Sequence, residues 1–318
     1  MNVKGILALG MTMALAAPAA AWAQAIEYPH KVVTLVTHSS PGGGSDVFLR
    51  ELSKYLGKQI NADFIVENVQ GGSGAKAMAR LATSPPDGSI FYATTPTYIY
   101  TSLLSAPEHK YDALQPLVNF FTDSEVVYTA AGSPYKSLAD VIARAKEGQG
   151  KWGAANPASL ERQAAEQLKA AAGVNAAIVT HEGGGDMMIN VLNGTLDVGI
   201  GEVQEIRSQL EANQVRLLAT FNPERMKDFP DVPTVKESGF DVVLQKFRGL
   251  AAPKGLPDEI GAIWDKAAQG VLADPEYQKD YQAQNLVANF IDHTKYPAFV
   301  DDFVQKTTAF LKQAGVIQ

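Results

Sequence analysis

Short apolar runs rich in β-branched residues alternate along this chain with segments of helical periodicity. VVTLV (32–36), FIVEN (64–68) and SIFYATT (89–95) predict strands, because each is brief and dominated by β-branched or aromatic residues. Between them, the apolar residues of 47–56 and 75–82 recur at helical spacing. This alternation predicts an α/β fold in which helices cover both faces of a mostly parallel sheet.

The same pattern starts again in the second half of the chain. Ser137 predicts the start of a helix over 138–146, and Gly173 predicts the end of a helix over 159–172. The proline-rich stretch 223–239 predicts a long connection, and two or three helices are expected at the C-terminus. Further strands are predicted at 126–130, 151–155, 176–181, 195–201, 215–221 and 246–253. A second unit of this kind, in a chain of 318 residues, indicates two domains.

Residues 1–23 have the features of a cleavable signal peptide. Lys4 precedes an apolar run, and Ala21-Trp22-Ala23 fits an A-x-A cleavage pattern. The alternative is a membrane anchor, but the apolar core is too short to span a bilayer comfortably. The chain contains no cysteine, so an exported protein of this sequence is held together by packing without disulfides.

Composition and motif searches exclude several functional classes. The formal net charge is −7 and the basic residues form no cluster, which argues against a nucleic-acid partner. The five histidines lack metal-ligand spacing, and neither a phosphate-binding loop nor a nucleophile elbow is present. We therefore expect no metal, no cofactor and no catalytic residues, so an anion would be bound by locally aimed donors.

Three glycine-rich loops follow predicted strands and precede predicted helices: PGGGSD (41–46), GGSG (71–74) and GGGD (183–186). The first backbone N–H groups of a helix lack partners and attract anions, and glycine lets a ligand approach them closely. The other interpretation is that these are ordinary turns between strand and helix. Arg162 and Arg248 offer guanidinium groups for a carboxylate. The alternative for Arg162 is a solvated helix face, and the alternative for Arg248 is a structural ion pair.

Several longer stretches carry a resemblance to a known family: YPHKVVTLVTHSSPGGGSD, FIVENVQGGSGAKAMARLA, FPDVPTVKESGF and FRGLAAPKGLP. In this order they resemble the Bug-type extracytoplasmic solute receptors, the substrate-binding components of tripartite tricarboxylate transporters. The resemblance implies a two-lobed periplasmic binding protein of the type II, Venus-flytrap kind. Lobe I would comprise 26–124 and 246–318, and lobe II would comprise 125–245.

The resemblance also implies a function without covalent chemistry. A monomeric periplasmic receptor would capture a small carboxylate, a di- or tricarboxylate being favoured, in the cleft between the lobes. It would then deliver this ligand to the large and small membrane subunits of the transporter. Two alternatives stay open, namely a ligand-binding partner of a membrane sensor and an exported hydrolase.

The family's binding positions map onto named residues of this chain. Ser39 stands where many relatives have an aromatic residue, and Arg162 stands where they often have histidine. An acid at Glu202 disfavours a poly-anion unless it pairs with arginine or turns away. The predicted ligand-binding residues are Ser39, Ser40, Gly43, Gly44, Asp46, Thr94, Thr95, Asn156, Ser159, Arg162, Gly184, Glu202 and Arg248.

Overall fold

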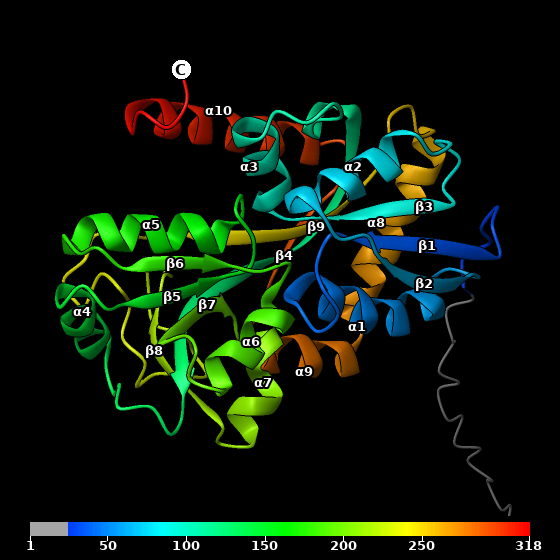
Figure 1. Cartoon of the computed structure of the whole chain (residues 1–318). Helices are drawn as coiled ribbons and strands as arrows, with labels where there is room; N and C mark the ends of the chain where they lie inside the picture. The colour runs from blue at the N-terminus through cyan, green and yellow to red at the C-terminus, as the bar shows by residue number, and fades with distance from the viewer. Residues whose placement is uncertain (1–24) are drawn as a thin grey trace, which may run out of the picture.

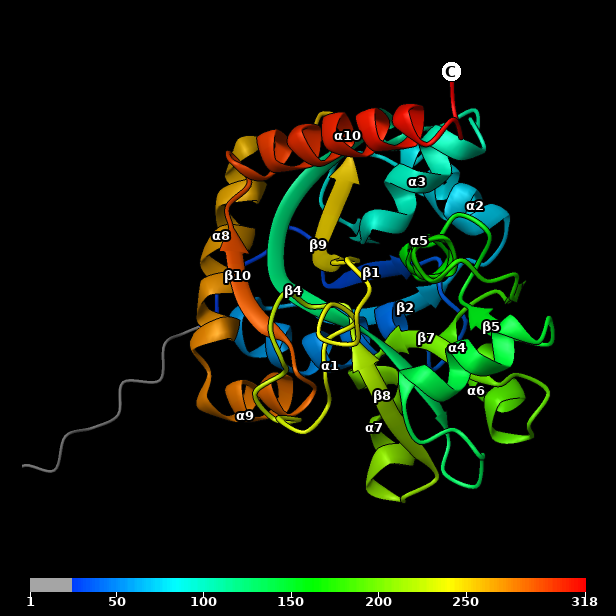
Figure 2. The ribbon, with the colours of Figure 1, turned by 90° about the vertical axis from the view of Figure 1, so that its left-hand side faces the viewer.

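A computed structural model describes residues 25–318, so the predicted signal peptide at 1–23 lies outside the described residues. Two groups of strands lie side by side and share one long strand, β4 (Leu114–Ala130) (Figure 1). Figure 2 shows β4 arcing from one group into the other. It pairs with β9 up to Ser124 and with β7 from Glu125 onwards.

In the first group, β2, β1 and β3 are parallel neighbours, and β9 runs antiparallel to both β3 and β4. In the second group, β6, β5 and β7 are parallel, while β7 and β8 run antiparallel to β4. The parallel part of each sheet was predicted, and the shared antiparallel strand makes each sheet mixed. The remaining strands are β1 (Val32–Thr37), β2 (Asp63–Asn68), β3 (Ile90–Thr94), β5 (Lys151–Ala154), β6 (Ala177–Thr180), β7 (Val198–Glu202), β8 (Val215–Thr220), β9 (Gln245–Pro253) and β10 (Val287–Ile291).

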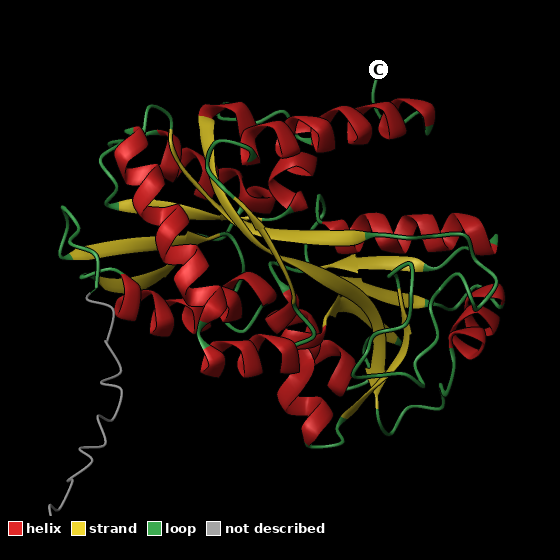
Figure 3. Cartoon of the chain, turned by 180° about the vertical axis from the view of Figure 1, so that it is seen from behind, coloured by secondary structure: helices red, strands yellow, loops and turns green. Residues whose placement is uncertain are grey.

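Helices surround both groups, and Figure 3 shows them in red against the yellow strands. The first group carries α1 (Gly44–Gln59), α2 (Ala75–Ala82), α3 (Pro96–Leu104), α8 (Asp258–Ala273), α9 (Pro275–Ala283) and α10 (Tyr296–Gln313). The second carries α4 (Leu138–Lys146), α5 (Leu160–Ala172), α6 (Gly184–Leu192) and α7 (Val203–Glu211). Short 3₁₀ turns occupy Gly72–Gly74 and Tyr111–Ala113. Within 25–318, no helix combines the length and apolarity required to cross a bilayer.

Each group has its own apolar core. Trp264 packs against Phe91 with ring centroids 4.5 Å apart in the first group, and Trp152 is buried in the core of the second. A smaller cluster joins the two groups, because Tyr100 of α3 and Leu311 of α10 share it with Leu160 of α5. The two groups therefore touch through apolar side chains as well as through β4.

Two predicted helices, 75–82 and 138–146, have the bounds that the structure shows, whereas α3 and β10 were not predicted. Thr95 caps α3 and Pro96 stands at its first position, both favourable for a helix start. The sequence of α3, PTYIYTSLL, is buried over most of its length, so it lacks the polar face on which a periodicity argument depends.

Candidate functional site

Five helices begin at the boundary between the two groups, and a small buried cavity lies among their starts. The starts of α1, α5, α6 and α7 all contribute to its wall, as do Thr97 of α3 and Lys246 of β9. The cavity has a volume of about 20 Å³, which is room for about one water molecule. Its wall consists of His38, Ser39, Gly44, Ser45, Thr97, Ala155, Asn156, Glu161, Glu182, Gly183, Gly184, Glu202, Glu205 and Lys246.

Two of the three glycine loops meet across this boundary. A side chain at Gly185 would collide with the carbonyl oxygen of Pro41, and a Cβ on Gly43 would lie 3.4 Å from the amide nitrogen of Gly184. None of these three glycines has a left-handed φ, so the close approach of the loops is what requires glycine there. The third loop, 71–74, does not line the cavity, and all three of its glycines have positive φ, as turns require.

A buried charge cluster forms one side of the cavity and extends behind it. We define it as Asp123, Glu125, Glu161, Glu202, Lys246 and Arg248, all of which are buried. The ammonium of Lys246 donates hydrogen bonds to Glu161 (2.5 Å) and Glu202, and it lies 3.3 Å from Glu125. The guanidinium of Arg248 donates to Asp123 (2.6 Å), and its Nη2 lies 3.2 Å from Glu202. Four carboxyl groups thus surround two cations.

Burial and the charge of Lys246 set the protonation of the neighbouring groups. Burial raises the pKa of Glu125 to about 8, although the nearby Lys246 charge opposes this rise. Burial also acts to raise the pKa of Glu161, but the charge of Lys246 and its hydrogen bond hold that pKa below the ordinary value. Burial, followed by the Lys246 charge, lowers the pKa of His38 to about 4. At neutral pH His38 is therefore uncharged and Glu125 is largely protonated.

The acidic side chains of the cluster resemble a metal site only in their spacing. One carboxylate oxygen from each of Glu125, Glu161 and Glu202 lies within 4.8 Å of the others. The ammonium of Lys246, however, contacts all three residues and so takes the position that a cation would need. Within the described part of the chain, this arrangement fits an internal ion-pair network better than a metal centre.

The structure brings most of the predicted binding residues to the cavity or directly behind it. Ser39, Gly44, Asn156, Gly184 and Glu202 line the wall. Three more predicted residues are buried directly behind the wall, namely Ser40, Gly43 and Arg248. A Cβ on the wall residue Gly44 would lie 2.6 Å from Arg248 Nη2, and a Cβ on the wall residue Gly183 would lie 2.5 Å from Ser40 Oγ. The condition attached to the Glu202 prediction is met, because this acid contacts Arg248.

The other predicted residues stabilise the surrounding scaffold. Asp46 accepts hydrogen bonds from Gly42 N and from its own helix neighbour Arg50. Thr94 Oγ1 is hydrogen-bonded to Tyr296, while Thr95 caps α3. Ser159 Oγ caps α5 by accepting from the amide of Arg162, 3.1 Å away.

The side chain of Arg162 is not in the cavity. It pairs with Glu166 at 2.5 Å, one turn along α5, and lines a separate surface hollow with Phe310. The reason is helical geometry: residues four apart lie on the same face of a helix. This placement agrees with the alternative interpretation of Arg162 as part of a solvated helix face, where it pairs with Glu166.

Sequence reasoning missed Asp123, Glu125, Glu161, Glu205 and Lys246. The sequence did carry a signal for some of these charges. Asp123 and Glu125 are two positions apart in an otherwise apolar segment, and so are Lys246 and Arg248. Residues spaced by two point to the same face of a strand, so charges there had to be buried together or solvated together. The positions of Glu161 and Glu205 in the first turns of α5 and α7 gave no such signal.

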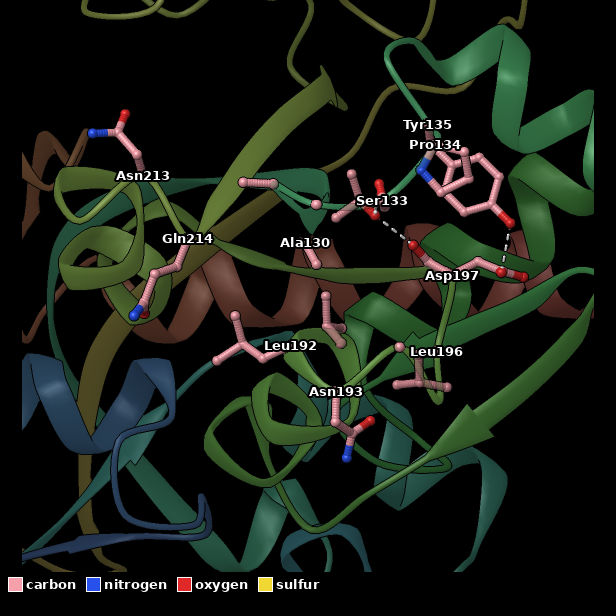
Figure 4. Close-up of a pocket in the computed structure, with 15 residues that line it drawn as sticks. Ala130, Ser133, Pro134, Tyr135, Leu192, Asn193, Leu196, Asp197, Asn213 and Gln214 are labelled. Atoms are coloured by element: carbon pink, nitrogen blue, oxygen red, sulfur yellow. Dashed lines mark hydrogen bonds between the residues drawn. The ribbon is translucent and has the colours of Figure 1, made fainter.

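A larger hollow of about 640 Å³ lies elsewhere on the second group (Figure 4). It shares no residue with the buried cavity. Figure 4 shows Tyr135 and Asp197 in contact, and the Tyr135 hydroxyl donates to Asp197 at 2.6 Å. The other oxygen of Asp197 accepts from the amide of Lys151. Since the one carboxylate of this hollow is already engaged, we place the candidate site at the buried cavity.

Comparisons with known proteins agree on one family. A sequence model of the family described as the tripartite tricarboxylate transporter family receptor matches residues 48–316. Among curated relatives, the UPF0065 protein in the gbd 5' region of Cupriavidus necator is 27% identical over 317 residues, covering 98% of this chain and 96% of that protein. Protein BugT of Bordetella pertussis is 24% identical and covers 99% of each chain.

Solved structures share the fold at low sequence identity. The periplasmic binding protein BugD superposes with a TM-score of 0.85 at 22% identity, covering 91% of this chain and 99% of that one. An R. palustris protein with adipate gives a TM-score of 0.85 at 22% identity, with the same coverage. MatC from Rhodopseudomonas palustris with bound malate gives 0.78 at 20% identity, covering 92% of this chain and all of that one.

Proposed function

This chain belongs to the tripartite tricarboxylate transporter family of receptors, a family of periplasmic solute-binding proteins, and we propose that it captures a small carboxylate between its two groups of strands. The captured ligand would be delivered to the large and small membrane subunits of a tripartite transporter. The observation that carries this proposal is the convergence of five helix starts on one buried cavity. Helix starts present unpaired N–H groups and a partial positive charge to an anion.

Capture would proceed by closure of two lobes about a hinge. We propose lobe I at 26–124 and 246–318, lobe II at 125–245, and a hinge where β4 and β9 pass between them. The register of β4 supports this division, because its pairing changes from β9 to β7 between Ser124 and Glu125. A cavity of about 20 Å³ does not hold a dicarboxylate, so the lobes would separate to admit one.

The cavity residues would share the work of binding. The helix-start amides at Gly44 and Gly184, with the hydroxyls of Ser39 and Ser40, would donate hydrogen bonds to a carboxylate. Arg248 would supply charge from behind α1, where its Nη2 makes an ion-pair contact with Glu202 but no hydrogen bond. The Glu202 carboxylate itself lies at the start of α1, since a Cβ on Gly44 would be 2.7 Å from its Oε2. A ligand carboxylate at α1 would therefore compete with this side chain.

Thermal unfolding of the purified mature protein against a panel of carboxylates tests the proposal. A ligand that binds only the folded state, present at 100 times its dissociation constant, adds about 2.7 kcal/mol to the free energy of unfolding. The panel would include citrate, malate, succinate and adipate together with their amino-substituted counterparts. A concentration-dependent rise in melting temperature with one of these compounds is expected. If no carboxylate raises the melting temperature, the proposed ligand class is wrong.

Delivery needs a separate measurement. Uptake of the identified ligand by cells that carry both membrane subunits should require this protein. Unchanged uptake after its deletion would contradict the transport role and favour the sensor alternative. Ligand recovered intact after prolonged incubation would argue against the hydrolase alternative.

A further inference from the structure

The carboxylate of Glu202 lies at the start of α1, although its backbone belongs to the junction of β7 and α7. A Cβ on Gly44, the first residue of α1, would lie 2.7 Å from Glu202 Oε2 and 3.1 Å from its Cδ. Glu202 is only 1% exposed, so water does not separate these groups. Because α1 and α7 belong to different groups of strands, this side chain reaches across the boundary between the groups.

The start of α1 offers the donors that recognise a carboxylate. The amides of Gly44 and Ser45 stand at the first two positions of the helix, where intrahelical partners are lacking. Arg248 is fully buried, and its Nη2 would lie 2.6 Å from a Cβ on Gly44 but makes no hydrogen bond within the described residues. Helix-start amides and a guanidinium both favour a carboxylate, so this position has the composition of a carboxylate subsite.

Glu202 fills this subsite incompletely. Its Oε2 accepts no hydrogen bond from any described residue. Its Oε1 lies 3.2 Å from Arg248 Nη2 as an ion pair without a hydrogen bond, and the same oxygen accepts from the Lys246 ammonium. A carboxylate that is not attached to α7 could turn to accept from the guanidinium and the helix amides together. Such a carboxylate would satisfy buried donors that Glu202 leaves unpaired, which favours its binding.

We propose that Glu202 is a tethered competitor, whose carboxylate occupies the subsite at the start of α1 until a ligand carboxylate displaces it. Gly44 permits either carboxylate to approach the helix, because a side chain at this position would meet both Arg248 and Glu202. The inference rests on the proposed function and adds what sets its affinity. A ligand has to offset the displacement of Glu202, so a monocarboxylate without further contacts should be rejected.

Acetate tests the subsite without knowledge of the natural ligand. Glu202→Ala removes the tethered carboxylate, while Arg248 keeps Asp123 and Lys246 keeps Glu161, so this variant should fold. Sodium acetate should raise the melting temperature of Glu202→Ala in proportion to its concentration, relative to sodium chloride at equal ionic strength. The wild type should show no such rise. Equal rises in both proteins, or no rise in either, would overturn the inference.

A second substitution locates the bound acetate. Gly44→Ala adds a Cβ 2.6 Å from Arg248 Nη2 and thereby blocks the subsite, so Gly44→Ala/Glu202→Ala should lose the acetate-dependent rise. Gly57→Ala makes the same change further along α1, where the nearest atom to the added Cβ is 3.9 Å away. The control Gly57→Ala/Glu202→Ala should therefore keep the rise. A rise retained with Gly44→Ala would place acetate elsewhere and overturn the inference.

Competition also predicts how the receptor's own ligand responds. The carboxylate identified in the thermal panel should bind Glu202→Gln at least about 10-fold more tightly than the wild type, because a neutral amide replaces a charged competitor. Glu161→Gln is the matched control. It also removes one carboxylate from Lys246, but the atoms nearest a Cβ on Gly44 belong to Arg248 and Glu202, so its gain should be smaller. Equal gains in calorimetric affinity would show that net charge alone sets the affinity and would overturn the inference.

The outcomes separate this inference from the proposed function. A panel ligand that binds the wild type and Glu202→Gln with equal affinity would overturn the inference and leave the carboxylate receptor intact. Acetate-dependent stabilisation of Glu202→Ala, with no panel ligand bound by any variant, would support the tethered carboxylate and contradict the proposed function. A ligand bound by Glu202→Gln and not by the wild type would support both.

Discussion

Glu125 of β4 and Glu202 of β7 are direct cross-strand partners, two acidic residues facing one another in an antiparallel pair. Like charges at such positions destabilise a sheet. The raised pKa of Glu125 keeps its carboxyl largely protonated, and the Lys246 ammonium contacts both side chains, so the two carboxyl groups do not meet as like charges. Lys246 and Arg248 come from β9, the strand that pairs with the other half of β4. A buried ion-pair network therefore lies where β4 passes between the two groups. Changing the charges of this network should alter stability and binding in measurable ways.

The stability of the protein should fall as pH rises toward about 8, because of Glu125. Its pKa is raised in the folded state, so below that pKa the folded protein holds a proton that the unfolded chain releases above about pH 4.3. Below the pKa of Glu125 in the unfolded chain, the contribution of this proton to stability is fully present. As pH rises from that pKa to the pKa in the folded protein, the free energy of unfolding falls by at most about 1.4 kcal/mol per pH unit. Glu125→Gln should remove this slope. Urea unfolding at about pH 7.5 and about pH 8.5, where His38 is almost entirely uncharged in both states, measures it.

Glu224→Gln serves as the control for this experiment, because Glu224 is exposed. It should retain the wild-type dependence on pH. Equal slopes in the wild type and Glu125→Gln would mean that Glu125 is not protonated in the folded protein.

Removing the Lys246 ammonium should destabilise the protein by about 3–5 kcal/mol. Lys246→Met would leave Glu161 buried without its cation and Glu202 with Arg248 alone. Adding Glu161→Gln should restore part of the loss, so a double-mutant cycle from urea unfolding should show strong coupling. A loss below about 1 kcal/mol for Lys246→Met, or simple additivity, would contradict this account of the cluster.

The contact between glycine loops should control closure. A Cβ at Gly185 would collide with the Pro41 carbonyl, so Gly185→Ala should hold the two groups apart while each remains folded. We expect a larger radius of gyration in small-angle scattering with ligand present, and an affinity at least about 10-fold lower, because closure contacts are lost. Gly132→Ala is the matched control, since no atom lies within 4 Å of its added Cβ and its φ is not left-handed. Equal behaviour of the two variants would show that these loops do not limit closure.

The two arginines predicted from sequence should behave differently. Arg162→Ala breaks a partly exposed pair with Glu166, so it should cost only about 0.3–0.5 kcal/mol and leave ligand affinity unchanged. Arg248→Met would leave Asp123 buried and unpaired, which should cost about 3–5 kcal/mol and abolish ligand binding. Chemical denaturation and calorimetry on both variants measure this contrast. A loss of ligand affinity in Arg162→Ala would place that side chain at the site after all.

Local features of the sequence were sufficient for much of the fold. The bounds of α2 and α4 and the αL cap at Gly173 follow from periodicity and capping, which involve only neighbouring residues. The glycine loops at 41–46 and 183–186 could be assigned to strand–helix junctions for the same reason. The resemblance of longer stretches of the chain to a family, which the family match over 48–316 confirms, supplied the two-lobed architecture.

The charges at the cavity depended on tertiary structure. Glu161 and Lys246 are 85 residues apart in sequence, yet their side chains form a 2.5 Å hydrogen bond. Their meeting requires the register of β9 on β4 and the placement of α5, neither of which leaves a periodic trace in the sequence. Arg162 is the contrasting case, because its partner Glu166 lies four residues along the same helix and their contact is local. Sequence thus determined where helices begin and which backbone groups are exposed there, because those properties are local. Only the fold decided which charged side chains converge on them, because burial and distance between remote residues set that arrangement.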